Sequence, residues 1–241
     1  MRKLVIIPTY NEIANISPMI DKVMSLDGGF DLLVIDDGSP DGTASVVVRR
    51  QEEFPDRLFL IERAGKLGLG TAYIAGFKWA LERGYDYVFE MDCDFSHDPD
   101  DLVRLCEAAA GGSDVVVGSR YVKGVNVVNW PMSRLLMSYF ASVYVRLVTR
   151  MPVRDATAGF VCYSRRALET IDLDAVRMKG YGFQVEMKYS AWRLGLRVSE
   201  VSIIFTERQQ GASKMSGGIF GEAFFGVMML PYRRIRRKNR E

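Results

Sequence analysis

The strongest constraint on the fold of this chain is a regular alternation of short apolar runs with helix-like segments. Apolar runs occupy residues 3–9, 32–37, 58–62, 85–92 and 114–120, and segments with helical spacing lie near residues 15–26, 41–53, 70–83 and 99–110. Strands that alternate with helices in this way favour βαβ units. We therefore expect an α/β fold with a doubly wound, mostly parallel sheet flanked by helices.

The pattern changes after residue 120. We expect a helix at 131–148, a strand at 159–164, a helix at 183–194, a strand at 198–205 and a loop at 206–215. The 131–148 segment carries a broad apolar stripe, which indicates either a core helix or a helix that faces lipid. The apolar stretch 219–230 is shorter than the ~18 to 20 residues that span a bilayer. We expect one domain in residues 1–215, followed by an amphipathic segment and basic tail in 216–241.

Basic residues are concentrated at the C-terminal end. The last eleven residues, PYRRIRRKNRE, contain six basic groups and one acid, which leaves 26 basic and 29 acidic groups in residues 1–230. A nucleic-acid-binding protein would spread positive charge over a face, so we expect no nucleic-acid partner. A tail that meets membrane phosphates, or a flexible solubilising tail, fits this distribution better.

Cysteine usage and the N-terminus indicate the compartment. Cys93, Cys106 and Cys162 form neither a CxxC pair nor an even set, so we expect no disulfide framework and no zinc site. The first apolar run is too short for the core of a signal peptide. With no signal peptide and no transmembrane helix expected, the chain is predicted to be a peripheral protein on the cytoplasmic face of a membrane.

Several enzyme classes fail on their motifs. GLGTAYIAG at residues 68–76 has Tyr73 where a dinucleotide-binding fingerprint needs its third glycine. Gly65 and Lys66 are followed by leucine instead of the serine or threonine of a P-loop. His97 is the only histidine and no GxSxG accompanies it, so we expect no histidine-dependent hydrolase. We expect the glycines to let a helix N-terminus approach the sheet closely, and His97 to orient a loop or face water.

Two aspartates, Asp92 and Asp94, follow the fourth apolar run within the stretch EMDCDFSHDP. In an extended strand residues i and i+2 point the same way, so both carboxylates would share one side while Cys93 faces the other. Two close anions repel unless a cation lies between them, and such oxygen ligands suit Mg²⁺ or Mn²⁺ together with substrate phosphates. The alternative is that Asp94 or Asp98 caps a helix that starts at Pro99.

Seven motifs follow one another along the chain: PTYNE, DDGSPDGT, KLGLGTAYIAGF, MDCDFSHDP, GSRY, DATAGF and ERQQGASKM. In this order they resemble the family 2 glycosyltransferases of the GT-A fold, and among these the polyprenol (dolichol) phosphate mannosyltransferases. The resemblance covers nearly the whole chain. It implies a Rossmann-like GT-A catalytic domain in residues 1–215 and an interfacial amphipathic segment after it.

The resemblance implies roles for the residues that match its motifs. A nucleotide pocket would be lined by Pro8, Tyr10, Glu12, Ile35 and Asp37. Asp92, Cys93 and Asp94 would meet the diphosphate and the metal, and Ser96 would complete the metal shell as a neutral ligand. Phosphates would be held by a set of cationic groups: Arg120, Lys179, Arg208 and Lys214. Arg134 in PMSRLL would hold the lipid phosphate.

The reaction implied by the resemblance is inverting transfer of mannose from GDP-mannose to a polyprenyl monophosphate, with Mg²⁺ or Mn²⁺ as cofactor. Charge on the departing nucleoside diphosphate would be stabilised by the metal and by arginine, together by several kcal/mol. The acceptor phosphate has a second pKa of about 6, so no catalytic base is needed and Asp92, Asp94 and Arg120 would carry the catalysis.

The sequence is also compatible with two other functions. One is transfer of another sugar, such as glucose from UDP-glucose. Another is a non-catalytic adaptor that binds nucleotide sugars at a membrane. Expected partners are the nucleotide sugar, the polyprenyl phosphate lipid and the membrane surface, and either the interfacial helices or an anchoring partner protein would hold the chain there.

Overall fold

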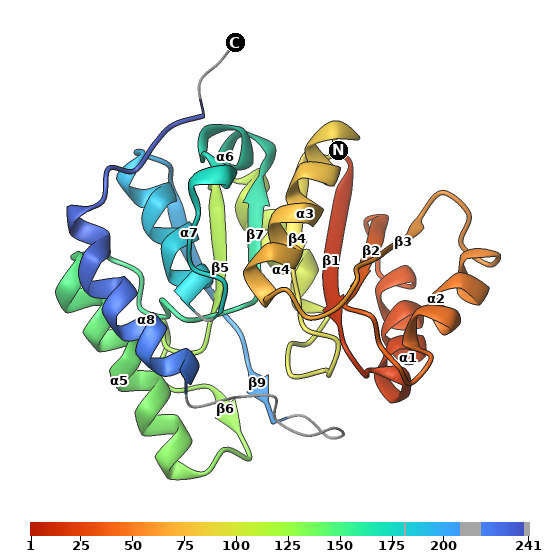
Figure 1. Ribbon diagram of the computed structural model, residues 1–241, viewed down its shortest axis with the longest axis horizontal. Helices are drawn as coiled ribbons and strands as arrows, with labels where there is room; N and C mark the ends of the chain where they lie inside the picture. The colour runs from red at the N-terminus through yellow and green to blue at the C-terminus, as the bar shows by residue number, and fades with distance from the viewer. Residues whose placement is uncertain (181, 208–217, 239–241) are drawn as a thin grey trace.

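The computed structural model describes residues 1–180, 182–207 and 218–238 (Figure 1). Within these residues a seven-stranded sheet has the order β3-β2-β1-β4-β7-β5-β8, and a two-stranded sheet pairs β6 with β9. The strands are β1 (Lys3–Thr9), β2 (Phe30–Asp36), β3 (Leu58–Glu62), β4 (Tyr87–Glu90), β5 (Val115–Ser119), β6 (Val127–Val128), β7 (Val161–Ser164), β8 (Val198–Ser202) and β9 (Phe205–Thr206).

Helices connect most of these strands. They are α1 (Ile13–Met24), α2 (Thr43–Gln51), α3 (Leu69–Glu82), α4 (Asp101–Ala110), α5 (Met132–Thr149), α6 (Arg165–Thr170), α7 (Gly182–Arg193) and α8 (Gly218–Met229), with short 3₁₀ turns η1 (Leu173–Ala175) and η2 (Leu230–Tyr232). All strand pairs of the large sheet are parallel except those that β7 makes with β4 and β5. The predicted α/β fold with a mostly parallel sheet is confirmed.

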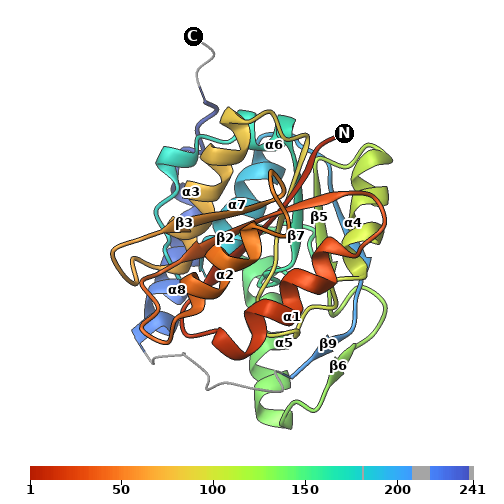
Figure 2. The same cartoon turned by 90° about the vertical axis from the view of Figure 1, so that its right-hand side faces the viewer.

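The alternation of side chains along β1 explains the layered arrangement. Leu4 and Ile6 join one buried cluster, whereas Val5 and Ile7 join another, because successive residues of a strand point to opposite faces. The first cluster is covered by α3, α6 and α7, and the second by α1, α2 and α4 (Figure 2). The core therefore consists of two apolar layers with the sheet between them.

The fourth strand and the helix after it begin and end differently from our expectation. The strand predicted at 85–92 is shorter in the structure, where β4 ends at Glu90. The aspartate pair therefore lies on the turn that follows. The predicted helix start at Pro99 is also wrong, since α4 begins at Asp101. Asp98 still stabilises the turn that precedes α4, because its Oδ1 accepts a hydrogen bond from the Asp100 N–H at 3.0 Å.

The predicted strand 198–205 divides into β8 and β9. Ile203 is buried and its N–H still donates to Ser119 O, but the N–H of Phe205 donates to Asn126 O. The chain thus leaves the large sheet after Ile203 and pairs with β6, a strand that the apolar pattern did not reveal. Two valines in a polar loop are too short a run to predict a strand.

Helices α5 and α8 lie side by side at one end of the sheet (Figure 1). Both expose large apolar side chains, which we call the apolar face: Leu136, Met137, Phe140 and Leu147 of α5 with Phe225 and Met229 of α8. Of the two interpretations of the 131–148 stripe, an exposed apolar helix describes α5 better than a core helix. Among the described helices, none has the length and apolar character needed to cross a bilayer.

The C-terminal segment is docked onto the body of the protein. The backbone of Arg236 accepts a hydrogen bond from the Asp172 N–H, and the Lys238 N–H donates to Thr170 O. Ile235 packs against the main apolar cluster. Of the two alternatives for the tail, a flexible solubilising segment is therefore wrong for residues 231–238.

Candidate functional site

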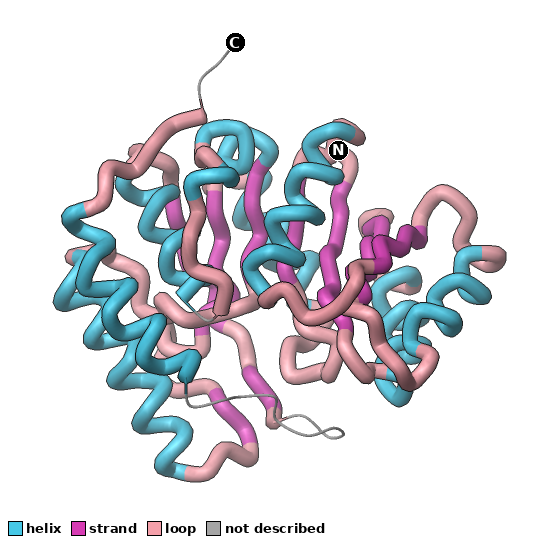
Figure 3. Tube along the Cα trace, viewed as in Figure 1, coloured by secondary structure: helices cyan, strands magenta, loops and turns pink. Residues whose placement is uncertain are grey.

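Most predicted site residues lie where β1, β2, β4 and β5 end and loops begin, at one edge of the sheet (Figure 3). The strand order reverses between β1 and β4, because the chain adds β2 and β3 on one side of β1 and the later strands on the other. Ligands of open α/β sheets bind outside the carboxyl ends of strands at such a switch point. PTYNE follows β1 and the aspartate pair follows β4, so the two motifs meet there.

The two aspartates at the end of β2 have different roles. The carboxylate of Asp36 accepts hydrogen bonds from Thr9 Oγ1 at 2.8 Å and from the N–H and Oγ of Ser39, which shapes the loop. Asp37 instead pairs with Arg63, whose Nε lies 2.6 Å from its Oδ1. Burial raises the pKa of Asp37 above its usual value, although Arg63 opposes this effect.

Arg63 also supports the start of α3. Its Nη1 donates to Thr71 Oγ1 at 2.8 Å, so one guanidinium joins β2 to the glycine-rich segment. The segment does approach the sheet closely, but in the middle of α3 instead of at its N-terminus, because a Cβ on Gly76 would lie 2.7 Å from Cδ1 of Ile6. A Cβ on Gly70 would likewise lie within 2.7 Å of the Phe183 ring.

The remaining predicted nucleotide residues occupy this half of the edge in different ways. Tyr10 lies under a cation that the sequence reasoning missed, since Lys66 Nζ is 3.7 Å from its ring centroid. Glu12 accepts a hydrogen bond from Asn15 Nδ2 at 2.8 Å, and Pro8 is half-buried within β1. Ile35 is fully buried, and its side chain faces Gly76 in the core.

The aspartate pair lies on a tight turn. Phe95 has φ of 58°, a left-handed conformation that is uncommon for a bulky residue and that turns the chain sharply after Asp94. Ser96 donates to Asp94 Oδ1 through its hydroxyl at 2.6 Å and its N–H at 3.1 Å. Asp94 and Ser96 therefore lie together, the Asp92 side chain is 45% exposed, and Cys93 is buried away from them.

His97 is buried behind this turn. Its ring stacks on Phe160 with 4.9 Å between ring centroids, and its Nδ1 accepts a hydrogen bond from the Asp92 N–H at 3.3 Å. Burial lowers the pKa of His97 to about 4, and this exceeds the opposing effect of Asp94. The expectation that His97 orients a loop agrees with these contacts, whereas the expectation that it faces water is wrong.

Arg120, after β5, is held by a buried carboxylate. Its Nε and Nη2 form a fork with Asp155 at 2.7 and 2.6 Å, and Nη2 also donates to Thr157 Oγ1 at 3.0 Å. Asp155 is fully buried and accepts the Arg120 N–H as well. Burial alone would lower the pKa of Arg120, but the carboxylate outweighs this effect and the pKa is raised.

The predicted lipid-phosphate residue, Arg134, lies at the start of α5. Its Nη1 is 2.9 Å from Glu207 Oε1, and its guanidinium lies over the Trp130 ring at 4.3 Å from the centroid. The Arg120 guanidinium lies 5.5 Å from the centroid of the same ring. Trp130 thus brings both arginines to one side of the site.

The structure describes one of the remaining three predicted cations. Lys179 is exposed, and its backbone carbonyl accepts a hydrogen bond from the Gly70 N–H at 2.8 Å, so its loop borders the start of α3. Arg208 and Lys214 lie outside the described residues.

Two carboxylates and a hydroxyl make up the possible metal ligands. Among the described residues no cluster of three or more histidine, cysteine, aspartate or glutamate side chains could hold a metal ion. Asp92, Asp94 and Ser96 nevertheless offer hard oxygen atoms, one of them well exposed, and Mg²⁺ needs only one or two protein carboxylates when substrate phosphates supply further ligands. The donor set fits such an ion in combination with a diphosphate.

Two buried ionisable groups, Glu90 at the end of β4 and Lys188 of α7, interact electrostatically. Glu90 is fully buried, as is Lys188. Burial raises the pKa of Glu90 to about 8 and lowers the pKa of Lys188 to about 8. Lys188 Nζ donates to Ala158 O at 2.6 Å and to Ala156 O at 3.2 Å, which fixes the loop that carries Asp155.

Sequence reasoning missed the partners of the predicted residues. They are Arg63, Lys66, Asp155, Thr157 and Glu207. A signal existed for four of them, since Lys66 belongs to KLGLGTAYIAGF, Asp155 and Thr157 to DATAGF, and Glu207 to ERQQGASKM, motifs whose side chains we noted without assigning these roles.

A comparison with known proteins places the chain among enzymes. Residues 4–172 match the model of glycosyl transferase family 2. The chain is 49% identical over 227 residues to undecaprenyl-phosphate mannosyltransferase of Micrococcus luteus, covering 94% of this chain and 93% of that protein. It is 47% identical over 226 residues to polyprenol monophosphomannose synthase of Mycolicibacterium smegmatis, covering 94% and 85%.

The fold is shared with a solved structure of lower sequence identity. Glucosyl-3-phosphoglycerate synthase from Mycobacterium tuberculosis, solved with Mn²⁺, uridine diphosphate and glucosyl-3-phosphoglycerate, superposes with a TM-score of 0.65 at 20% identity. The match covers 95% of this chain and 78% of that one. The likeness supports the predicted GT-A type of α/β fold.

Proposed function

The chain belongs to glycosyltransferase family 2, and from this premise we propose that it transfers mannose from GDP-mannose to a polyprenyl monophosphate with inversion at the anomeric carbon. The observation that carries the proposal is the identity of nearly half of the residues, over almost the full chain, to two proteins named for mannosyl transfer to polyprenyl phosphates. The paired carboxylates at the β1–β4 switch point and the buried Arg120 after β5 fit this chemistry.

The donor would bind across the two halves of the sheet edge. Tyr10 and Asp37 border the half nearest β2, where Lys66 and Arg63 support them. Asp92, Asp94 and Ser96 would hold Mg²⁺ or Mn²⁺ together with the diphosphate, where a divalent ion would neutralise charge on the leaving group. The use of Mn²⁺ by a protein of the same fold supports a divalent metal without choosing between the two ions.

Arg120 would stabilise the departing diphosphate. Asp155 occupies Nε and Nη2, which fixes the plane of the guanidinium before substrate arrives. A preorganised charge of this kind stabilises a developing anion without having to reorient during the reaction. We propose Arg208 and Lys214 as further phosphate ligands on the basis of their motif alone.

The acceptor would supply its own nucleophile. A phosphate monoester has a second pKa of about 6, so one of its oxygens carries charge near neutral pH and can attack without a general base. Arg134 would hold this phosphate, and its present partner Glu207 would have to yield or share it. The new bond joins the phosphate oxygen to the anomeric carbon, and the bond from that carbon to the nucleoside diphosphate breaks.

The apolar face would hold the prenyl chain at a membrane surface. Leu147 is 75% exposed and Phe225 is 69% exposed, and these positions lie on the two neighbouring helices α5 and α8. Burial of apolar side chains in the interface would supply binding energy without a spanning helix. We propose that the chain is a peripheral protein of the cytoplasmic face, with or without an anchoring partner.

Assay of several donors tests the proposal directly. Purified full-length chain, Mg²⁺ and polyprenyl phosphate should release GDP from GDP-mannose and form a mannosyl lipid, with little turnover of UDP-glucose. Faster turnover of UDP-glucose, or no release of GDP, would overturn the assignment of the donor.

Substitution of the aspartate pair separates an enzyme from a non-catalytic adaptor. Asp94→Asn should lower the turnover rate by at least about 100-fold, since loss of a metal-held charge removes several kcal/mol of transition-state stabilisation. Asp98→Asn is the matched control, because Asp98 is exposed on the same loop and an amide oxygen can still accept the Asp100 N–H. Equal activity of the two variants would contradict the role of Asp94.

A further inference from the structure

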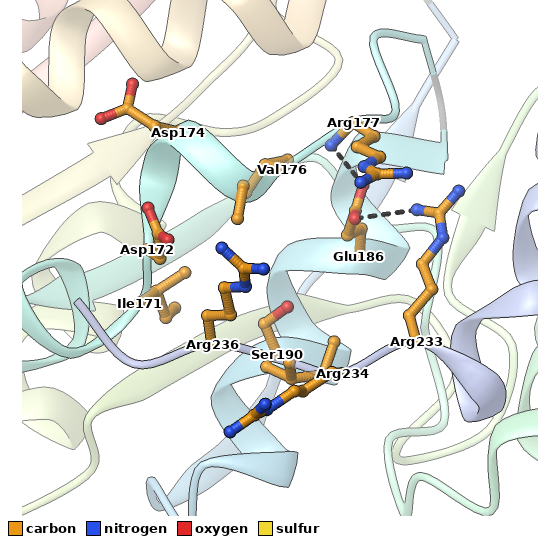
Figure 4. A pocket seen from close by; sticks show the side chains of 12 residues that line it. Ile171, Asp172, Asp174, Val176, Arg177, Glu186, Ser190, Arg233, Arg234 and Arg236 are labelled. Carbon is orange, nitrogen blue, oxygen red and sulfur yellow. Dashed lines mark hydrogen bonds and ion pairs between the residues drawn. The ribbon is translucent and has the colours of Figure 1, made fainter. Parts of the chain in front are cut away.

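A cavity of about 490 Å³ lies between η1, helix α7 and the C-terminal segment. Its walls come from three parts of the chain: residues 171–177, α7 through Glu186 and Ser190, and residues 233–236 (Figure 4). None of these residues belongs to the predicted donor or acceptor site. The volume is within the range of small-molecule sites in proteins, about 300 to 1,000 Å³.

More basic than acidic side chains line this cavity. Four arginines contribute to the lining, namely Arg177, Arg233, Arg234 and Arg236, against three acids, namely Asp172, Asp174 and Glu186. Asp174 is already paired with Lys78 of α3. Glu186 accepts Arg233 Nη1 at 3.1 Å, together with the N–H groups of Arg177 and Met178.

The remaining balance favours an anion. With Glu186 and Asp174 compensated, the lining retains one acid, Asp172, against three further arginines, Arg177, Arg234 and Arg236. Within the described residues these three guanidinium groups make no hydrogen bond and no ion pair with another side chain. Figure 4 shows the Arg236 side chain between Asp172 and Glu186, directed toward Val176.

The backbone of the cavity is held in place before any ligand binds. Ile171 and Arg237 form an antiparallel bridge. Ile235, which lies between Arg234 and Arg236 in the sequence, packs against the main apolar cluster. Arginine forks bind phosphate oxygens in pairs, and a site that is already ordered loses less entropy on binding. The loop of Arg177 continues to Lys179, whose carbonyl oxygen accepts a hydrogen bond from the Gly70 N–H at the start of α3.

We infer that this cavity is a binding site for a phosphate-bearing anion, separate from the donor and acceptor sites. The occupant contacts the same loop that borders the start of α3. Its phosphate comes either from a soluble phosphate compound or from the headgroup of an anionic phospholipid, since the C-terminal segment continues directly from α8 of the apolar face.

Two binding experiments test the site with the full-length chain. In the first, inorganic phosphate is titrated into protein saturated with GDP and Mg²⁺, so that the donor site is filled, and the arginine Nε–H signals are followed by NMR. In the second, the chain is mixed with phosphatidylcholine vesicles with and without phosphatidylglycerol. Each is repeated with the double variant Arg177→Gln/Arg236→Gln.

The control removes the same charge elsewhere. Arg166 and Arg193 are exposed and do not line the cavity, so Arg166→Gln/Arg193→Gln is the matched double variant. We expect the cavity variant to bind at least about tenfold more weakly than the control in one of the two experiments, because hydrogen bonds to charged groups are the stronger kind. A defect with phosphate indicates a soluble ligand, and a defect only with phosphatidylglycerol indicates a headgroup.

Equal binding by the two double variants in both experiments would overturn the inference. Folding of the variants is checked by their melting temperatures. The NMR titration of the unaltered chain is independent of them, and phosphate-dependent shifts that miss Arg177, Arg234 and Arg236 in the first experiment, with no preference for phosphatidylglycerol in the second, would also overturn it. The inference does not depend on mannosyl transfer, since neither experiment measures turnover.

Discussion

Two arginine–aspartate pairs lie at the same edge of the sheet. In one pair the aspartate is the predicted ligand residue, and in the other the arginine is. In the β2 half, Asp37 belongs to the predicted ligand residues and Arg63 supports it from behind. In the β5 half, Arg120 is the predicted ligand residue and Asp155 is the support. The Asp37 side chain is 12% exposed, whereas that of Asp155 is fully buried.

This difference in depth has an energetic consequence. Asp155 accepts three hydrogen bonds from Arg120, so removal of either partner leaves a charge with little access to water. Asp37 retains some access to water and also interacts with Lys66. The β5 half should therefore be the more sensitive of the two, and the following predictions test that ranking.

The largest effect is expected at Asp155. Asp155→Asn should lower the free energy of unfolding by about 3 to 5 kcal/mol, because breaking a buried pair leaves the Arg120 charge uncompensated. Urea denaturation measures this loss. Glu169→Gln is the control, since it breaks an exposed pair with Arg165 that contributes at most about 0.5 kcal/mol. A loss similar to that of the control would contradict the ranking.

The next effect concerns His97, which lies beside the β5 half. Its pKa of about 4 is below the ordinary histidine value of 6.5, so the unfolded chain binds a proton between these values that the folded chain does not. Stability from this group is complete above pH 6.5 and is lost as the pH falls toward 4, by about 3 kcal/mol in total.

The single imidazole makes this test simple. In chelator-treated protein, its NMR signal should titrate below pH 5, and His97→Gln should flatten the fall of stability between pH 6.5 and pH 4. Titration near pH 6.5 in the folded protein would show that the ring is not held in its neutral form.

A smaller effect is expected from the other pair. Arg63→Gln should cost about 1 to 3 kcal/mol of stability and weaken GDP binding, because Asp37 loses its partner and α3 loses the bond to Thr71. Urea denaturation and a GDP titration measure the two effects. Arg57→Gln is the control, since Arg57 Nε lies 3.7 Å from Asp31 Oδ1 in an ion pair that is longer and more exposed than that of Arg63 with Asp37. If Arg63→Gln were more damaging than Asp155→Asn, the comparison would be reversed.

The smallest change in stability is expected at Glu207. Its pair with Arg134 is about one-third exposed on each side, so Glu207→Gln should cost less than about 1 kcal/mol. Freed from this carboxylate, Arg134 should bind the acceptor phosphate more tightly and lower its KM several-fold, with the KM of GDP-mannose unchanged. A rise in the acceptor KM would mean that Glu207 orients Arg134 and does not compete for it.

Prediction from the sequence succeeded for elements that depend on a continuous run of apolar residues. The strands β1, β2, β3 and β5 follow from apolar runs, and the polar residues at their ends follow from where each run stops. It failed at β9, where one apolar run of eight residues divides between two sheets because Phe205 pairs with Asn126. It also placed the aspartate pair on a strand, although the strand ends at Glu90 and Phe95 turns the chain.

The order of apolar and polar residues along the chain was enough to predict the α/β fold, the sheet edge and the aspartate pair. The spacing of apolar residues in a strand or a helix depends only on residues that are close in the sequence. The supporting partners depended on folding. Arg63 meets Asp37 across 26 positions, Asp155 meets Arg120 across 35, and Glu207 meets Arg134 across 73. Such pairs form only when strands bring distant residues together and exclude water, so burial and pKa, like the arginine-lined cavity, are properties of the assembled structure.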